Sequence, residues 1–189
     1  MKTISSIFDQ CPDALQNRQT SREQETRLRQ GRSNAIQFLG LAKKPSGKVA
    51  GRLEEQGYQP EEILHILREL KEDGYLDDHA LAMKTLRQRT GRKAESKAAL
   101  AQRMKLAGIS TEAIDEVLKQ APDDQDSARD LLHARFPELM STYPDLSPSE
   151  KRKHKLKIAR FLAGRGFSQD VVTRVLSDNL TDIMDDTYI

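Results

Sequence analysis

Three glycines, Gly57, Gly108 and Gly166, each lie at the centre of the same pattern of apolar residues. Apolar side chains stand eight and four residues before each glycine, directly after it, and six, nine and ten residues after it. In chain order these positions hold Val49, Leu100 and Ile158; Leu53, Met104 and Leu162; Tyr58, Ile109 and Phe167; Ile63, Ile114 and Val172; Ile66, Val117 and Val175; and Leu67, Leu118 and Leu176. Agreement at all of these positions predicts that one structural unit occurs three times.

The spacing within the pattern predicts two helices joined at the glycine. Residues four apart before the glycine share one face of a helix, and so do residues three and four apart after it. Glycine also recurs every 17 residues, at Gly57, Gly74, Gly91 and Gly108, each time after an apolar-periodic segment. Because a left-handed residue commonly ends a helix at such a place, these glycines are predicted C-caps.

A further apolar-periodic stretch precedes each pair of helices, over residues 35–42, 79–90 and 127–140. The sequence contains no convincing period-two strand pattern. It therefore predicts an all-α fold of three tandem three-helix repeats, which would form an elongated, curved array. The predicted segments are a mobile polar arm (1–32), the three repeats (33–73, 74–121 and 122–180) and an acidic tail (181–189).

Polar residues mark where several helices should begin, because their side chains can accept hydrogen bonds from the unpaired N–H groups of a first turn. The predicted starts are Ser46, Ser110, Ser168, the capping box Ser147-Pro148-Ser149-Glu150, the segment Pro60-Glu61-Glu62, and Asp77-Asp78 before His79.

With 37% hydrophobic residues, 5% aromatic residues and no Trp, the chain can build several thin apolar cores rather than one large core. It has no run of about 18 apolar residues that would predict a membrane span. Residues 1–15 are too polar for a signal peptide. Cys11 is the only cysteine, which excludes an internal disulfide. A cytoplasmic, monomeric protein is the expectation that follows.

The net charge of +2 conceals blocks of like charge. Between residues 84 and 105, eight basic residues accompany a single acid, Glu95, and between residues 151 and 165 seven basic residues occur without an acid. Acid-rich segments lie at residues 61–78 and 112–130. Alternating blocks suit a surface that contacts a charged, repetitive partner, whereas ordinary solvated helix faces are the alternative interpretation.

The sequence contains no recognisable catalytic or metal-binding pattern. The four histidines, His65, His79, His133 and His154, lack a cysteine or carboxylate at metal-ligand spacing. Residues 43–48 lack the first glycine and the hydroxyl residue that a phosphate-binding loop needs. No Gly-x-Ser-x-Gly motif is present. We therefore expect neither an enzyme nor a bound cofactor or metal.

The segment Gly74-Tyr75-Leu76-Asp77-Asp78 resembles the signature of the RecX family, regulators of the RecA recombinase. The resemblance covers about residues 33–180. One stretch, Gly91-Arg92-Lys93-Ala94-Glu95-Ser96, departs from the family, which often has a second glycine and a proline in this turn. The third unit resembles the C-terminal repeat of the family through Lys151-Arg152-Lys153, Arg160-Phe161-Leu162, Arg165-Gly166-Phe167, Val172 and Val175-Leu176.

The resemblance implies a non-enzymatic protein that binds along the groove of the RecA filament on single-stranded DNA. Such proteins bridge neighbouring protomers and modulate or suppress ATP hydrolysis, strand exchange and co-protease activity. A weak, non-specific DNA contact is compatible with this function. For this chain we hypothesise two strips of contact residues, Arg87, Arg89, Arg92 and Lys93 in the second repeat, and Lys151, Arg152, Lys153, Lys155, Lys157, Arg160 and Arg165 in the third.

Several alternatives stay open. Tyr75 either covers the junction between the first and second repeats, which its apolar neighbour Leu76 favours, or presents its hydroxyl to a partner. The chain could instead be a free-standing DNA-binding protein, since three-helix units resemble helix-turn-helix domains, or a repeat scaffold for another protein. No predicted helix concentrates Arg, Asn and Gln on one face, so specific base readout is not expected. Phe161 and Phe167 are predicted core residues.

Overall fold

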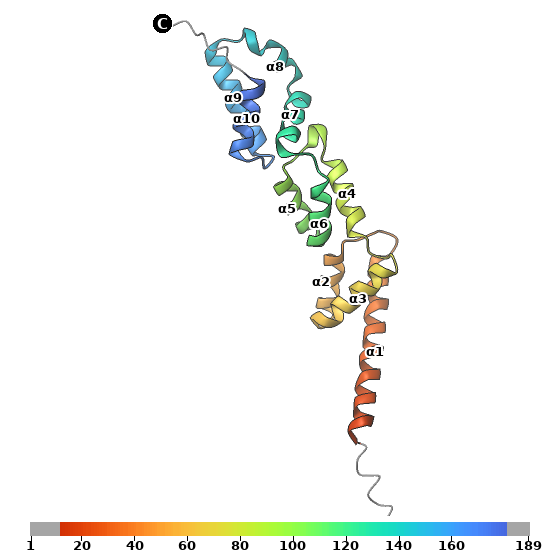
Figure 1. Ribbon diagram of the computed structural model, residues 1–189. Helices are drawn as coiled ribbons and strands as arrows, with labels where there is room; N and C mark the ends of the chain where they lie inside the picture. Colours follow the sequence, from red (N-terminus) through yellow and green to blue (C-terminus); the bar gives the residue numbers. More distant parts are fainter. Residues whose placement is uncertain (1–11, 181–189) are drawn as a thin grey trace, which may run out of the picture. The chain divides into compact units, whose positions relative to one another are not determined.

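The computed structural model describes residues 12–180, with side chains described from residue 22 onward. Helices α1 to α10 and two short 3-10 turns, η2 and η3, form its regular structure, and this part of the chain contains no strand (Figure 1). The prediction of an all-α fold is confirmed. The chain divides into two compact units, which meet in sequence between Asp77 and Asp78.

The first unit packs α1 (Pro12–Leu39), α2 (Ser46–Glu55) and α3 (Pro60–Glu72) around one apolar core. Each of the three helices contacts the other two. This unit is the first three-helix repeat. Its buried core residues are Ala35, Leu39, Val49, Leu53, Ile63, Ile66, Leu70 and Leu76.

Helix α1 extends back to Pro12 and so occupies much of the segment that was expected to be a polar arm. Leu28 on α1 packs against the core of the first unit. Gly31 is buried against Tyr58 and Ile66, so closely that an added Cβ would lie 2.6 Å from Ile66 Cδ1. Arg27 Nε lies 2.7 Å from the Glu62 carboxylate. These contacts come from a glycine, an arginine and one leucine, which leave little apolar periodicity in the sequence. Residues 1–11 and the predicted acidic tail lie outside the described residues.

The first unit continues past Gly74, where the sequence placed a repeat boundary, to Asp77. The reason lies in how α3 ends. Gly74 has a φ of 76°, and the backbone N–H groups of Tyr75 and Leu76 both donate to the carbonyl of Leu70. This fold-back of the chain, typical of a helix end at a left-handed residue, buries Leu76 in the first core, while Tyr75 stays 44% exposed.

The second repeat contains α4 (Asp78–Gln88), η2 (Gly91–Lys93), α5 (Lys97–Ala107) and α6 (Thr111–Lys119). Helix α4 contacts both α5 and α6, which also contact each other. At the start of α4, the Asp78 carboxylate accepts a hydrogen bond of 2.8 Å from the backbone N–H of Ser110, the N-cap of α6. Asp78 therefore links the first and third helices of this repeat. The buried core residues are Ala82, Leu86, Leu100, Met104, Ile109, Ala113, Ile114, Val117 and Ala121.

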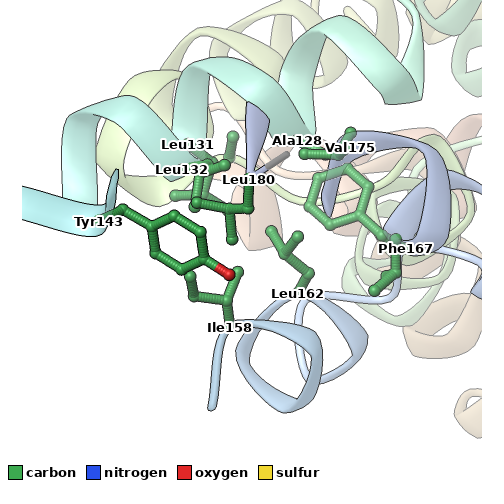
Figure 2. Close-up of a cluster of buried hydrophobic side chains, with 11 residues drawn as sticks. Ala128, Leu131, Leu132, Tyr143, Ile158, Leu162, Phe167, Val175 and Leu180 are labelled. Carbon is green, nitrogen blue, oxygen red and sulfur yellow. The ribbon is translucent and has the colours of Figure 1, made fainter. Parts of the chain in front are cut away.

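The third repeat contains α7 (Asp124–Arg135), α8 (Pro137–Thr142), η3 (Tyr143–Asp145), α9 (Pro148–Ala163) and α10 (Gln169–Asn179). The sequence predicted one helical stretch over residues 127–140, but α7 ends at Arg135 because Pro137 cannot continue it. Figure 2 shows the core of this repeat, in which Tyr143 from η3, Leu162 from α9 and Phe167 meet the leucines of α7.

The repeat predicted around Gly57, Gly108 and Gly166 is present in the structure. All three glycines have a left-handed φ, between 81° and 89°. The apolar positions eight and four residues before each glycine, and six and nine residues after it, are buried in all three repeats. Gly74 and Gly91, with φ values of 76° and 56°, also adopt the predicted left-handed conformation.

Most predicted helix starts are confirmed. The hydroxyls of Ser110 and Ser168 accept hydrogen bonds from backbone N–H groups three residues later. Ser46 was predicted as an N-cap, and this was wrong: Pro45 occupies the N-cap position, and Ser46 is the first residue of α2. Extended backbone at Pro45, with ψ of 147°, starts the helix one residue earlier than the serine alone indicated.

Candidate partner-binding surface

Helix α9 carries most of the longer predicted basic strip, and its start is fixed by a capping box. The Ser147 hydroxyl accepts a hydrogen bond from the Glu150 N–H, and the Glu150 carboxylate accepts one from the Ser147 N–H at 3.0 Å. The carboxylate also accepts a 2.6 Å hydrogen bond from the Ser147 hydroxyl. These hydrogen bonds, the one from the hydroxyl first, lower the pKa of Glu150 below its ordinary value. An anion at this position also favours the helix dipole.

The two faces of α9 differ sharply. Ile158 and Leu162 are fully buried in the core of the third repeat. Lys153, Lys157 and Arg160 are exposed, and their spacing of four and three residues places them on one side of the helix. Of the other strip residues on α9, Arg152 is exposed, whereas Lys151 and Lys155 are partly buried at the edges of the core.

Arg165 follows α9 rather than lying on it. Its guanidinium lies 5.3 Å from the centre of the Phe161 ring, which in turn meets Phe136 edge to face at 5.4 Å. The carbonyl of Arg165 accepts a 3.1 Å hydrogen bond from the backbone N–H of Ser96, in the second repeat. Phe161 is thus a partly buried support for Arg165, whereas Phe167 is the core residue that the sequence predicted.

The shorter predicted strip is divided between internal contacts and solvent. Arg92 Nε donates to the Ala134 carbonyl on α7 at 2.9 Å. Arg89 lies 3.3 Å from the Glu95 carboxylate. Arg87 and Lys93 are exposed. Of the four cations, Arg92 therefore joins the second repeat to the third, Arg89 pairs within the second repeat, and Arg87 and Lys93 remain exposed.

Glu95 is the polar residue at this junction that sequence reasoning missed. Its side chain is only 8% exposed, and its carboxylate accepts two hydrogen bonds from Arg103, of 2.9 and 2.8 Å, besides the contact with Arg89. The hydrogen bond to Glu95 raises the pKa of Arg103. A signal was available: Glu95 is the single acid among eight basic residues, and such an isolated carboxylate indicates an internal ion pair.

The junction brings the two predicted strips together. Gln88, Arg89, Lys93 and Arg165 line one open hollow of about 520 Å³. Three of these four residues were predicted from two separate charge blocks. The candidate surface therefore consists of the exposed face of α9 and this hollow, joined through Arg165.

Within residues 12–180, no three His, Cys, Asp or Glu side chains gather in a way that could hold a metal ion. Among the described helices, none is long and apolar enough to cross a membrane.

Comparison with known proteins shows which protein family this chain resembles. A family model described as the third three-helix domain of RecX matches residues 123–176, the segment that carries α7 to α10. The regulatory protein RecX of Halorhodospira halophila is 30% identical over 142 residues, covering 75% of this chain and 83% of the relative. That of Chlorobium phaeobacteroides is also 30% identical over 142 residues and is covered to 88%.

Two solved structures share the fold. A crystal structure of RecX from Lactobacillus salivarius matches with a TM-score of 0.58 at 18% identity, over 80% of this chain and 95% of that one. Another crystal structure of regulatory protein RecX matches with a TM-score of 0.59 at 19% identity, over 85% of this chain and 76% of that one.

Proposed function

Because the chain belongs to the RecX family, we propose that it is a non-enzymatic regulator that binds the filament of RecA recombinase on single-stranded DNA. It modulates the filament in the inhibitory direction, lowering ATP hydrolysis, strand exchange and co-protease activity. It acts in the cytoplasm, where the filament forms.

The observation that supports this proposal is the exposed cationic face of α9. Lys153, Lys157 and Arg160 project from a helix whose opposite side is fixed in the core by Ile158 and Leu162. In the described part of the chain neither Lys157 nor Arg160 forms an ion pair, so both charges are available to a partner. Charges held on a rigid helix attract an oppositely charged surface and orient it before contact.

The repeated architecture supports a repeated partner. A filament presents the same surface at every protomer, and a chain with three related units can engage more than one protomer at once. Linked contacts raise the overall affinity well above that of each contact alone. Strong inhibition at low ratios of regulator to protomer is the result expected of such binding.

The test is RecA ATPase activity on single-stranded DNA, with this chain titrated below one copy per protomer. The variant Lys153→Glu, Lys157→Glu and Arg160→Glu should bind the filament about 10- to 100-fold more weakly, because three exposed charge pairs of about 0.5–1 kcal/mol each become repulsive. Its helical circular dichroism should be unchanged. A control variant, Lys48→Glu, Arg68→Glu and Lys71→Glu, changes the net charge equally at exposed positions of the first unit. Undiminished inhibition by the α9 variant would contradict the assignment of this face.

A further inference from the structure

A second hollow, of about 580 Å³, lies beside the first, between α5 and the turn that follows α9. Its apolar lining comes from Ala99, Leu106 and Ala107 on α5 and from Ala163 at the end of α9. Leu106 is 80% exposed, although it faces a hollow whose other side is built by the same compact unit. Gly166 also lines the hollow, and a Cβ added to it would lie 2.8 Å from both Ala99 Cβ and Ser96 Oγ.

The apolar lining continues along α9. Leu156 is 52% exposed and lies seven residues before Ala163, which places both on one side of the helix, about 10 Å apart. The neighbours of Leu156 on this face are Lys153, three residues before it, and Arg160, four residues after it, and both are exposed. Leu156, Ala163 and Leu106 therefore form an apolar stripe along the basic surface, and we use "leucine stripe" for these three residues.

Basic residues outnumber acids around the leucine stripe. Arg103 and Arg165 line the hollow together with a single acid, Glu95. The Glu95 carboxylate is already engaged by Arg89 and Arg103. An occupant of the hollow therefore meets an apolar floor with cationic edges, and its own complement is an apolar side chain flanked by carboxylates.

Building on the proposed function, we infer that the leucine stripe docks an acidic, amphipathic segment of the protein part of the filament, not its nucleic acid. Phosphate recognition needs cations, and single-stranded bases need exposed aromatic platforms. Exposed leucines serve neither. In a protein interface, by contrast, two leucines at the centre of a charged rim supply the desolvated contacts that dominate affinity.

The first experiment is photo-crosslinking from this surface. Full-length chain carrying p-benzoylphenylalanine in place of Leu106 is bound to the RecA filament on single-stranded DNA, irradiated and mapped by mass spectrometry. A crosslink to a recombinase segment that holds Asp or Glu next to apolar residues supports the inference. A crosslink to DNA, to residues 181–189 of the chain itself or to a recombinase segment without carboxylates, or no crosslink, overturns it.

The second experiment measures affinity. Leu106→Gln with Leu156→Gln should weaken filament binding at least about tenfold, the factor that 1.4 kcal/mol corresponds to, and leave binding to a free single-stranded oligonucleotide and the melting temperature unchanged. The matched control is Leu41→Gln with Leu64→Gln, two exposed leucines of the first unit. If the parent binds and inhibits the filament while the stripe variant binds equally well, the inference fails and the proposed function stands. If the parent does not bind, both fail.

Discussion

Replacing Gly166 by alanine should destabilise the protein more than the same change at other left-handed glycines. Gly166 has a φ of 85°, a conformation that costs an L-residue about 1–2 kcal/mol. A Cβ at this position would also lie 2.8 Å from both Ala99 Cβ and Ser96 Oγ. Ala99 Cβ belongs to helix α5 and Ser96 is fully buried, so neither atom can move away freely.

The crowding adds to the conformational cost. Inserting a methyl group into a close-packed contact costs about 1–3 kcal/mol, so Gly166→Ala should lose about 2–5 kcal/mol of unfolding free energy in total. Two controls isolate the conformational part. Gly57 (φ 81°) has a matching backbone, and Gly91 (φ 56°) lies in the same unit, and neither has an atom within 4 Å of an added Cβ. Gly57→Ala and Gly91→Ala should each cost no more than about 1–2 kcal/mol.

The assay is urea denaturation followed by circular dichroism at pH 7, with hydrogen exchange as a local readout. The Ser96 amide, which donates to the Arg165 carbonyl, should exchange faster in Gly166→Ala because the two repeats are forced apart there. The reasoning is refuted if Gly166→Ala costs no more than the two controls, or if the Ser96 amide keeps its protection.

Two further predictions concern polar contacts. Glu95→Gln leaves Arg89 and Arg103 without their anion. It should lower the free energy of unfolding by about 1–2 kcal/mol, the range for a charged hydrogen bond to partly exposed arginines. If urea denaturation shows a loss under about 0.5 kcal/mol, Glu95 behaves like an ordinary surface residue. Because the folded-state pKa of Glu150 is lowered, its contribution to stability is present above the unfolded value near 4.5 and is lost as the pH falls through the folded value. Ser147→Ala removes the main cause of that shift, so the melting temperature of this variant should fall less on acidification below pH 4.5 than that of the parent; equal falls would disprove the link.

The sequence was sufficient for features set by local spacing. The glycine-centred repeat predicted the burial of Val49, Leu100 and Ile158, because apolar residues on one helix face must share a core. The capping box at Ser147 was predicted because its two partners lie three residues apart. The opposite faces of α9, with Lys157 outward and Ile158 inward, follow from the same helical period.

Features that depend on distant residues were not predicted. The packing of Gly31 against Ile66 rests on a side chain that is absent, so no sequence pattern marks it. The Glu95 pair with Arg103 joins residues eight apart, and Glu95 lines a hollow together with residues of the third repeat that its own sequence neighbours do not reveal. The hollow that joins Arg89, Lys93 and Arg165 arises only when two repeats meet, which neither charge block reveals alone.

The contacts between the second and third repeats have a consequence for how such a chain can evolve. Ser96 donates its backbone N–H to the backbone carbonyl of Arg165, and Arg92 donates to the carbonyl of Ala134. Every residue type provides a carbonyl, so the side chains at positions 165 and 134 can be exchanged without losing these hydrogen bonds. Mutation can therefore retune the affinity of the surface for its partner while the spacing of the two repeats is inherited unchanged.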